Sequence, residues 1–218
     1  MKNLQKRILT ALVVFPLSIF FIIKGGSYLV SFLYAILILA NYEVFLAFKK
    51  KLSIIFLDVT LVISLLSMLH LRNDTASSYI LLIWIIILTV CSDIGGYVFG
   101  KTFKGKKLTK ISPNKTLSGV VGSFIFSLSS VFLLALVIGI ISGLDSNFIL
   151  KPKFFILAII FSLAAQAGDL TISYLKRLDK LKDTGKILPG HGGIFDRIDS
   201  LMFVVITANI LYSLKIFP

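Results

Sequence analysis

The sequence has a single cysteine and few charged residues for its length. Cys91 has no second cysteine to pair with, which excludes an internal disulfide and a metal site built on cysteines. Charged residues make up 15% of the 218 residues, whereas soluble domains carry about 25%. The sequence also lacks internal repeats and low-complexity linkers. Because no polar domain is left to bind nucleic acid, we exclude nucleic acid as a partner.

Long apolar segments fill most of the chain instead. Hydrophobic residues account for 57% of the sequence, and a helix that spans a bilayer needs roughly 20 mostly apolar residues. Seven segments approach this requirement: 8–23, 28–48, 54–71, 79–98, 118–142, 154–172 and 200–217. We therefore predict an all-α, polytopic integral membrane protein with about seven transmembrane helices. Residues 1–218 are expected to form a single membrane-embedded domain.

The basic residues are distributed unevenly between the predicted loops. The chain has 23 Lys and Arg against 10 Asp and Glu, a net charge of +13. If the N-terminus is cytoplasmic, 18 of the 23 lie on the cytoplasmic side, in segments 2–7, 49–51, 101–115 and 176–197. The positive-inside rule favours this orientation. We expect a multi-pass protein of the cell (inner) membrane, with two long cytoplasmic loops at about 99–117 and 173–199 and anionic membrane lipids beside the lysines.

Acidic residues occur at the predicted membrane boundary. Four aspartates lie near the expected cytoplasmic ends of helices: Asp93, Asp169, Asp196 and Asp199. An ionisable residue at membrane depth is a candidate functional residue, and an ion pair with a lysine is the alternative explanation. Helix-dipole stabilisation is a further alternative for Asp199. Glu43 and Asp58 also lie toward the cytoplasmic side, but nothing near them in sequence suggests a role, so we favour structural pairing for both.

The sixth apolar segment carries a polar stripe at its end. Asp169, Ser173 and Lys176 have the spacing i, i+4, i+7, so they share one face if the helix continues beyond the membrane. A carboxylate, a hydroxyl and an ammonium group together suit a metal ion and a phosphorylated ligand. Ser173 alone would more often be a helix-packing residue.

A glycine-rich turn follows the polar stripe. It reads Pro189-Gly190-His191-Gly192-Gly193 and precedes a helix that opens with Asp196 and Asp199. Glycines allow the backbone to turn tightly and approach a ligand closely. The amides of this turn and the N-terminus of the following helix are a candidate anion site. His191 could donate a hydrogen bond to phosphate or transfer a proton, or it could be a hydrogen-bonded structural residue.

The other long loop contains a second candidate phosphate site. In Ser112-Pro113-Asn114-Lys115-Thr116 a lysine lies between hydroxyl side chains, just before a predicted helix. This combination suits a phosphate group. Ser-Pro and Thr caps are also common at helix starts, which is the alternative explanation for Ser112 and Thr116.

These motifs together resemble the signature of the phosphatidate cytidylyltransferases, also called CDP-diacylglycerol synthases. The matching residues are Gly168-Asp169-Leu170, Ser173, Lys176-Arg177, Lys182-Asp183, Gly185, Pro189 to Gly193, Asp196-Arg197 and Asp199. Segment 112–119 resembles the family element SPxKTxxG, and segment 93–100 resembles DxxAYxxG with Gly96 in place of the alanine. The resemblance covers residues 93–200, which are the expected catalytic region. Residues 1–92 are expected to form N-terminal transmembrane helices, and 201–218 the last transmembrane helix.

The resemblance implies a nucleotidyltransferase that transfers cytidylyl from CTP to phosphatidic acid with Mg²⁺. Asp169 and Asp196 would hold one or two metal ions. The cations expected to neutralise the phosphates are Lys176, Arg177, Lys182 and Arg197. The remaining candidate substrate-binding residues are Asp93, Ser112, Lys115, Thr116, Ser173, Asp183, Gly190, His191, Gly192, Gly193 and Asp199.

Two other classes of protein are alternatives. One is another membrane lipid phosphotransferase, such as a CTP-dependent polyprenol kinase or a lipid-linked sugar-phosphate transferase. The other is a transporter, although transporters usually show paired repeats and broken helices at the bilayer midplane. A homodimer stays open, because nothing in the sequence fixes the oligomeric state.

Overall fold

The computed structural model describes residues 3–73, 76–109, 112, 115–142, 149–185, 187, 188, 190 and 192–216. This part of the chain contains seven α-helices and no β-strand, which confirms the all-α prediction. The helices are α1 (Asn3–Lys24), α2 (Gly26–Ala47), α3 (Lys51–Leu71), α4 (Ala76–Phe103), α5 (Leu117–Ser142), α6 (Pro152–Leu178) and α7 (Phe195–Ser213).

The bounds of helices α6 and α7 differ from the predicted segments at the residues that form the candidate site. The sixth segment was predicted to end at 172, but α6 continues to Leu178, so Asp169, Ser173 and Lys176 share one helix as expected. The seventh was predicted to start at 200, whereas α7 begins at Phe195 and has Asp196 in its first turn. An acid there is stabilised by the helix dipole. The apolar criterion missed this turn because its residues are charged.

The described helices are consistent with a membrane protein. Five are long and apolar enough to cross a membrane: α2, α3, Ser78–Phe103 of α4, Leu117–Gly139 of α5, and α6. Within the described residues, α1 has only a shorter apolar stretch, Leu12–Lys24, and α7 does not meet the same criterion. Large apolar side chains such as Leu46, Phe132 and Leu163 are exposed. This outward apolar surface is what lipid contact requires.

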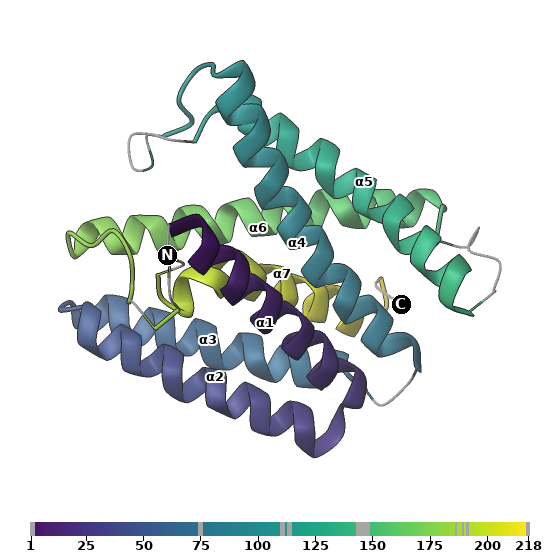
Figure 1. Cartoon of the computed structure of the whole chain (residues 1–218), viewed down its shortest axis with the longest axis horizontal. Helices are drawn as coiled ribbons and strands as arrows, with labels where there is room; N and C mark the ends of the chain where they lie inside the picture. The colour runs from purple at the N-terminus through teal and green to yellow at the C-terminus, as the bar shows by residue number, and fades with distance from the viewer. Residues whose placement is uncertain are drawn as a thin grey trace.

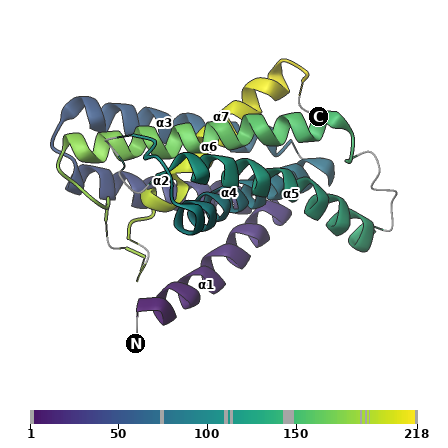
Figure 2. The same ribbon diagram turned by 90° about the horizontal axis from the view of Figure 1, so that it is seen from above.

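Helix α7 lies in the middle of the bundle (Figure 1). It packs against α2, α3, α4 and α6, with α6 and α3 as its most extensive neighbours. Helices α4 and α5 form the closest helix pair. In Figure 2 the N-terminal end of α1 projects away from the other helices.

The segments predicted to be cytoplasmic are joined to one another at one end of the bundle. The backbone N–H of Lys50, between α2 and α3, donates a 3.2 Å hydrogen bond to Asp179 Oδ1 at the end of α6. Lys115, from the α4–α5 loop, forms an ion pair with Asp169 of α6. The folded chain therefore gathers three lysine-rich segments together, as the charge distribution predicted.

Candidate active site

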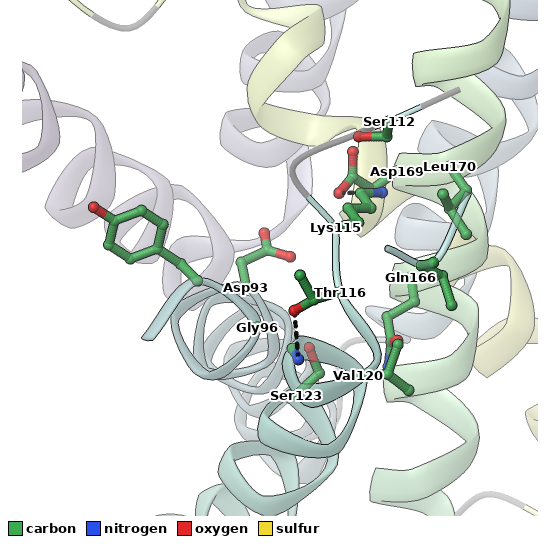
Figure 3. Close-up of a pocket in the computed structure, with 13 residues that line it drawn as sticks. Asp93, Gly96, Ser112, Lys115, Thr116, Val120, Ser123, Gln166, Asp169 and Leu170 are labelled. Atoms are coloured by element: carbon green, nitrogen blue, oxygen red, sulfur yellow. Dashed lines mark hydrogen bonds and ion pairs between the residues drawn. The ribbon is translucent and has the colours of Figure 1, made fainter. Parts of the chain in front are cut away.

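A cavity of about 350 Å³ lies between α4, α5, α6 and the loop that joins α4 to α5 (Figure 3). Its polar lining includes five predicted site residues: Asp93, Ser112, Lys115, Thr116 and Asp169. Asp93 comes from α4 and Asp169 from α6. Carboxylates and a lysine around one cavity suit a phosphorylated ligand.

Asp169 is held at the cavity by residues from two elements. Lys115 Nζ lies 2.7 Å from Asp169 Oδ2, and the two side chains are 24% and 35% exposed. Ser173, one turn further along α6, donates a 3.3 Å hydrogen bond to Asp169 Oδ1. The lysine pairing that we gave as the alternative explanation for Asp169 therefore occurs. The Lys115 ammonium group itself is buried, so a phosphate in the cavity would have to displace Asp169 to pair with it.

The loop between α4 and α5 places Lys115 by a short antiparallel pairing. Leu108 N–H donates to Lys115 O at 2.8 Å, and Leu117 N–H donates to Lys106 O at 3.0 Å. Thr116 Oγ1 accepts the N–H of Gly119 at 3.1 Å and so caps α5. Thr116 therefore caps a helix, as in the alternative explanation that we gave for it, and its side chain also lines the cavity.

Close contact between α4 and α5 forms one wall of the cavity. A Cβ built at Gly95 would lie less than 3 Å from the carbonyl oxygen of Gly122. A Cβ at Gly96 would lie 2.8 Å from Ser123 Oγ. The two backbones approach this closely because the crossing residues lack side chains. Gly96, which replaces the alanine of the family element, lies in this packed crossing, next to the side chain of Ser123.

A second polar cluster lies between α6 and α7. Lys176 Nζ is 2.9 Å from Asp196 Oδ1, and both side chains are at least nine-tenths buried. Asp196 Oδ2 accepts the backbone N–H groups of Thr184, at 2.8 Å, and Gly193, at 3.1 Å. The lysine pairing given as the alternative for Asp196 is thus also present. The Gly193 amide, which we predicted to contact phosphate, instead donates to Asp196.

Two residues of α7 connect this cluster to the cavity. Asp199 is buried, lies 4.0 Å from Lys176 Nζ through its Oδ2, and interacts electrostatically with both Asp169 and Asp196. Arg197 lies close enough to Asp93 to interact electrostatically with it. The acids at the ends of α4, α6 and α7 therefore belong to one charged region.

Comparison with known proteins identifies the family of this chain. The model of the cytidylyltransferase family matches residues 46–215. The chain belongs to this family. A cytidylyltransferase relative from Rickettsia felis, named phosphatidate cytidylyltransferase, is 38% identical over 219 residues, which cover 99% of this chain and 93% of the relative. A Rickettsia conorii protein of the same name is 36% identical, with 99% and 92% coverage.

A third relative extends the comparison to a longer cytidylyltransferase. The Helicobacter pylori J99 protein, also named phosphatidate cytidylyltransferase, is 39% identical over 140 residues, covering 62% of this chain and 48% of the relative. The resemblance we drew from the sequence rested on residues 93–200. The Rickettsia relatives match nearly the whole chain, including the N-terminal helices, in which we recognised no family motif.

Several predicted residues of this cytidylyltransferase neither line the cavity nor bond to Lys176 or Asp196 in the second polar cluster. Arg177 is exposed, and its Nη1 donates a 2.7 Å hydrogen bond to Leu181 O at the end of α6. Lys182 and Asp183 are exposed in the following loop. Gly190 and Gly192 have φ values of 78° and 88°, in the left-handed region that favours glycine. His191 lies outside the described residues.

Motif reasoning missed residues that complete the site. Gln166 lines the cavity one turn before Asp169, and its Nε2 donates to Ser162 Oγ at 3.3 Å. Its i, i+3 spacing from Asp169 is a signal that could have found it. Glu43 was assigned to structural pairing, yet its carboxylate lies against the loop before α7. No sequence signal joins these segments, because 152 residues separate Glu43 from Phe195.

The donor set fits Mg²⁺ only when substrate shares the coordination. Among the described residues, no group of three or more Asp, Glu, His or Cys side chains could hold a metal ion alone. Asp93 and Asp169 nevertheless face one cavity together with the hydroxyl of Thr116. Mg²⁺ is commonly bound by one or two carboxylates, with waters and substrate phosphates as further ligands. The oxygen donors present match that pattern.

Proposed function

We propose that this protein transfers the cytidylyl group of CTP to phosphatidic acid, giving CDP-diacylglycerol and pyrophosphate for phospholipid synthesis. The observation that carries the proposal is the cavity where Asp93, Lys115 and Asp169 meet, in a chain of the cytidylyltransferase family. Relatives that match nearly the whole chain are named for this activity. CTP and phosphatidic acid are the substrates that follow.

The reaction requires positioning and charge neutralisation more than proton transfer. A phosphate monoester has a second pKa of about 6, so the phosphatidic acid headgroup is largely a dianion at neutral pH. One of its oxygens forms a bond to the α-phosphorus of CTP, while the bond from that phosphorus to the bridging β-phosphate oxygen breaks. Pyrophosphate leaves with the bonding electrons. A site of carboxylates, lysines and hydroxyls suits such an in-line displacement.

The lysines and arginines at the cavity, in the Lys176–Asp196 cluster and on the nearby surface have separate roles in this proposal. Lys115 lines the cavity and would exchange Asp169 for phosphate oxygens when CTP binds. Lys176 is buried between α6 and α7, where it fixes Asp196. Arg197 would neutralise negative charge near Asp93. Arg177 and Lys182 are exposed and would attract the triphosphate from solution.

We further propose Mg²⁺ as the cofactor. Asp169 would hold it from the cavity, with Asp196 from the neighbouring cluster as the second protein ligand. Bound Mg²⁺ neutralises charge on the attacking and leaving oxygens in such reactions. Asp196 is buried and its Oδ1 is paired with Lys176, so metal binding there would require the carboxylate to exchange this lysine for the ion.

The site is proposed to face the cytoplasm from the inner membrane. The lysine-rich segments 49–51, 101–115 and 176–197 favour that side by the positive-inside rule. The lipid phosphate would reach the cavity at headgroup level while its acyl chains lie along the apolar helices, and CTP would arrive from water. A homodimer remains compatible with this arrangement and is not required by it.

Incubation of purified protein with CTP, phosphatidic acid and Mg²⁺ tests the proposal. Label at the α-phosphate of CTP should become lipid-extractable, and label at the γ-phosphate should appear in pyrophosphate. Lipid-extractable γ-label would instead identify a lipid kinase. No transfer of either label to lipid would rule out both activities, and ion-coupled uptake in proteoliposomes would then test the transporter class.

A further inference from the structure

Glu43 of α2 lies against the loop that leads into α7. The residue is only 3% exposed, which is unusual for a carboxylate. Its Oε2 accepts a 3.2 Å hydrogen bond from the backbone N–H of Phe195, the first residue of α7. Its Oε1 is buried without a hydrogen-bond partner among the described residues. A buried carboxylate is costly unless its surroundings use it.

Two loop glycines make room for this carboxylate. A Cβ built at Gly185 would lie less than 3 Å from Glu43 Oε1, and all of its nearest neighbours are Glu43 atoms. A Cβ built at Gly193 would come equally close to Glu43 Oε2 and to Thr184 Oγ1. Neither glycine has a positive φ. These two glycines are therefore required by the space that Glu43 occupies, whereas Gly190 and Gly192 are required by backbone conformation.

The same short stretch of loop holds Asp196. The N–H groups of Thr184 and Gly193 both donate to Asp196 Oδ2. One of these amides belongs to Gly193 itself, and the other belongs to Thr184, the residue before Gly185. Both glycines lie beside the Glu43 carboxylate. Glu43 therefore contacts the same two backbone segments, at Gly185 and Gly193, whose N–H groups bind the Asp196 carboxylate. Phe195, fully buried and packed with Ala40 and Val44 of α2, fixes the distance between the helices.

We propose that Glu43 is a positioning residue for the cytidylyl transfer, which rests on the function proposed above. It holds Gly185, Gly193 and the start of α7 in the geometry that presents Asp196 to Lys176 and, on the proposed function, to metal. It touches neither the cavity nor substrate. Glu43 lies outside residues 46–215, which the family model matches, so the functional part of the chain extends into α2.

The first test compares Glu43→Ala with Glu43→Gln and with Asp58→Asn. Glu43→Ala should raise the Mg²⁺ concentration for half-maximal activity about fivefold or more and lower kcat about tenfold or more, since misplacement near 1 Å can cost about a hundredfold. Glu43→Gln keeps an oxygen that can accept from Phe195 and should recover most of the loss. Asp58→Asn changes a partly buried acid in α3 and should leave both values unchanged. The Mg²⁺ concentration for half-maximal activity does not depend on the fraction of enzyme that is folded, so it separates a positioning role from a loss of folded protein.

A second test probes the same contact from the loop. Gly185→Ala should raise the Mg²⁺ concentration for half-maximal activity, because the three atoms nearest to its Cβ all belong to Glu43. The double variant Glu43→Ala/Gly185→Ala should be no worse than Glu43→Ala alone, since the collision is gone. If Glu43→Ala does not fold, Gly185→Ala decides the question by itself. Wild-type half-saturation for Mg²⁺ and CTP in a folded Gly185→Ala or Glu43→Ala protein would overturn the proposal.

A third measurement does not need activity. Lys182 is exposed in the loop that Glu43 supports, so trypsin should cleave after it several-fold faster in Glu43→Ala than in wild type or Asp58→Asn. Unchanged cleavage would contradict the role of Glu43 in holding the loop. If wild type forms no CDP-diacylglycerol but the cleavage difference is present, the proposed function fails while the loop contact stands.

Discussion

The ammonium group of Lys115 lies 2.7 Å from the carboxylate of Asp169, so the α4–α5 loop is joined to α6 at the edge of the cavity. If Lys115 exchanges Asp169 for the phosphate oxygens of CTP, Lys115→Met should lower kcat/KM about 10- to 100-fold. The estimate follows from the roughly 1.5–3 kcal/mol of a hydrogen bond to a charged group. Lys115→Arg keeps the charge and should lose less. Equal kcat/KM for Lys115→Met and wild type would limit the lysine to a structural pair.

The two predicted metal carboxylates are tested by isosteric changes. Asp169→Asn and Asp196→Asn should each reduce turnover below detection, because an amide removes the charge that Mg²⁺ requires. Both proteins should still insert into membranes and elute as folded species in detergent. Asp74→Asn, in a predicted outside loop, is the control and should be near neutral. Substantial CTP turnover by either site variant would remove that residue from the metal site.

The orientation of the bundle is tested by cysteine labelling in a Cys91→Ser background. Cysteines at Lys106 and Lys182 should be protected from an impermeant thiol reagent in intact cells, because both positions are predicted to be cytoplasmic. A cysteine at Asn147 should react. The opposite labelling pattern would place the cavity on the side without CTP.

Gly192→Ala tests the glycine turn before α7. Its φ of 88° disfavours a side chain, and a Cβ there would lie 3.2 Å from Asp196 Oδ2. We expect a loss of about tenfold or more in kcat, since small displacements at a reacting site are costly. Gly26→Ala is a matched control: its φ is 50°, but nothing lies within 4 Å of its Cβ. Kinetics of a folded Gly192→Ala protein equal to those of Gly26→Ala and wild type would contradict a role of this turn in the site.

The glycines between α4 and α5 should matter mainly for stability. Gly122→Ala would push a Cβ against the carbonyl of Gly95 and the ring of Phe99. Overpacking of this kind costs about 1–3 kcal/mol, so the thermal midpoint in detergent should fall by several degrees. Ser129→Ala, on the exposed side of α5, should leave the midpoint unchanged. A normal midpoint for Gly122→Ala would show that the two helices can separate freely.

The sequence predicted the helices well because their apolar lengths and caps are local properties. It also placed Asp169, Ser173 and Lys176 on one face of α6, since helical periodicity needs only one segment. It did not predict which lysine pairs with which acid. Lys115 and Asp169 come from different elements, and their contact depends on how α4, α5 and α6 cross.

The role of Glu43 illustrates the other limit of sequence reasoning. An isolated acid in an apolar helix has no local partner, so a general structural pairing was the only available interpretation. Its neighbours, Gly185 and Gly193, could be interpreted as flexible turn residues from sequence, but the space they leave is filled by a side chain from α2. Such a contact depends on the tertiary packing of α2, α6 and α7.

The glycine crossing of α4 and α5 also determines how the cavity can deform. Because the backbones at Gly95 and Gly122 approach each other this closely, a tilt of one helix against the other would open the contact that forms one wall of the cavity. Helix α6 is held to the α4–α5 pair near the cavity by weaker links, the Ser92–Ser162 hydroxyl contact of 3.0 Å and the Lys115–Asp169 pair. The side of the cavity that faces α6 is therefore joined to the α4–α5 pair by polar side-chain contacts, and breaking the Lys115–Asp169 pair would loosen that side first.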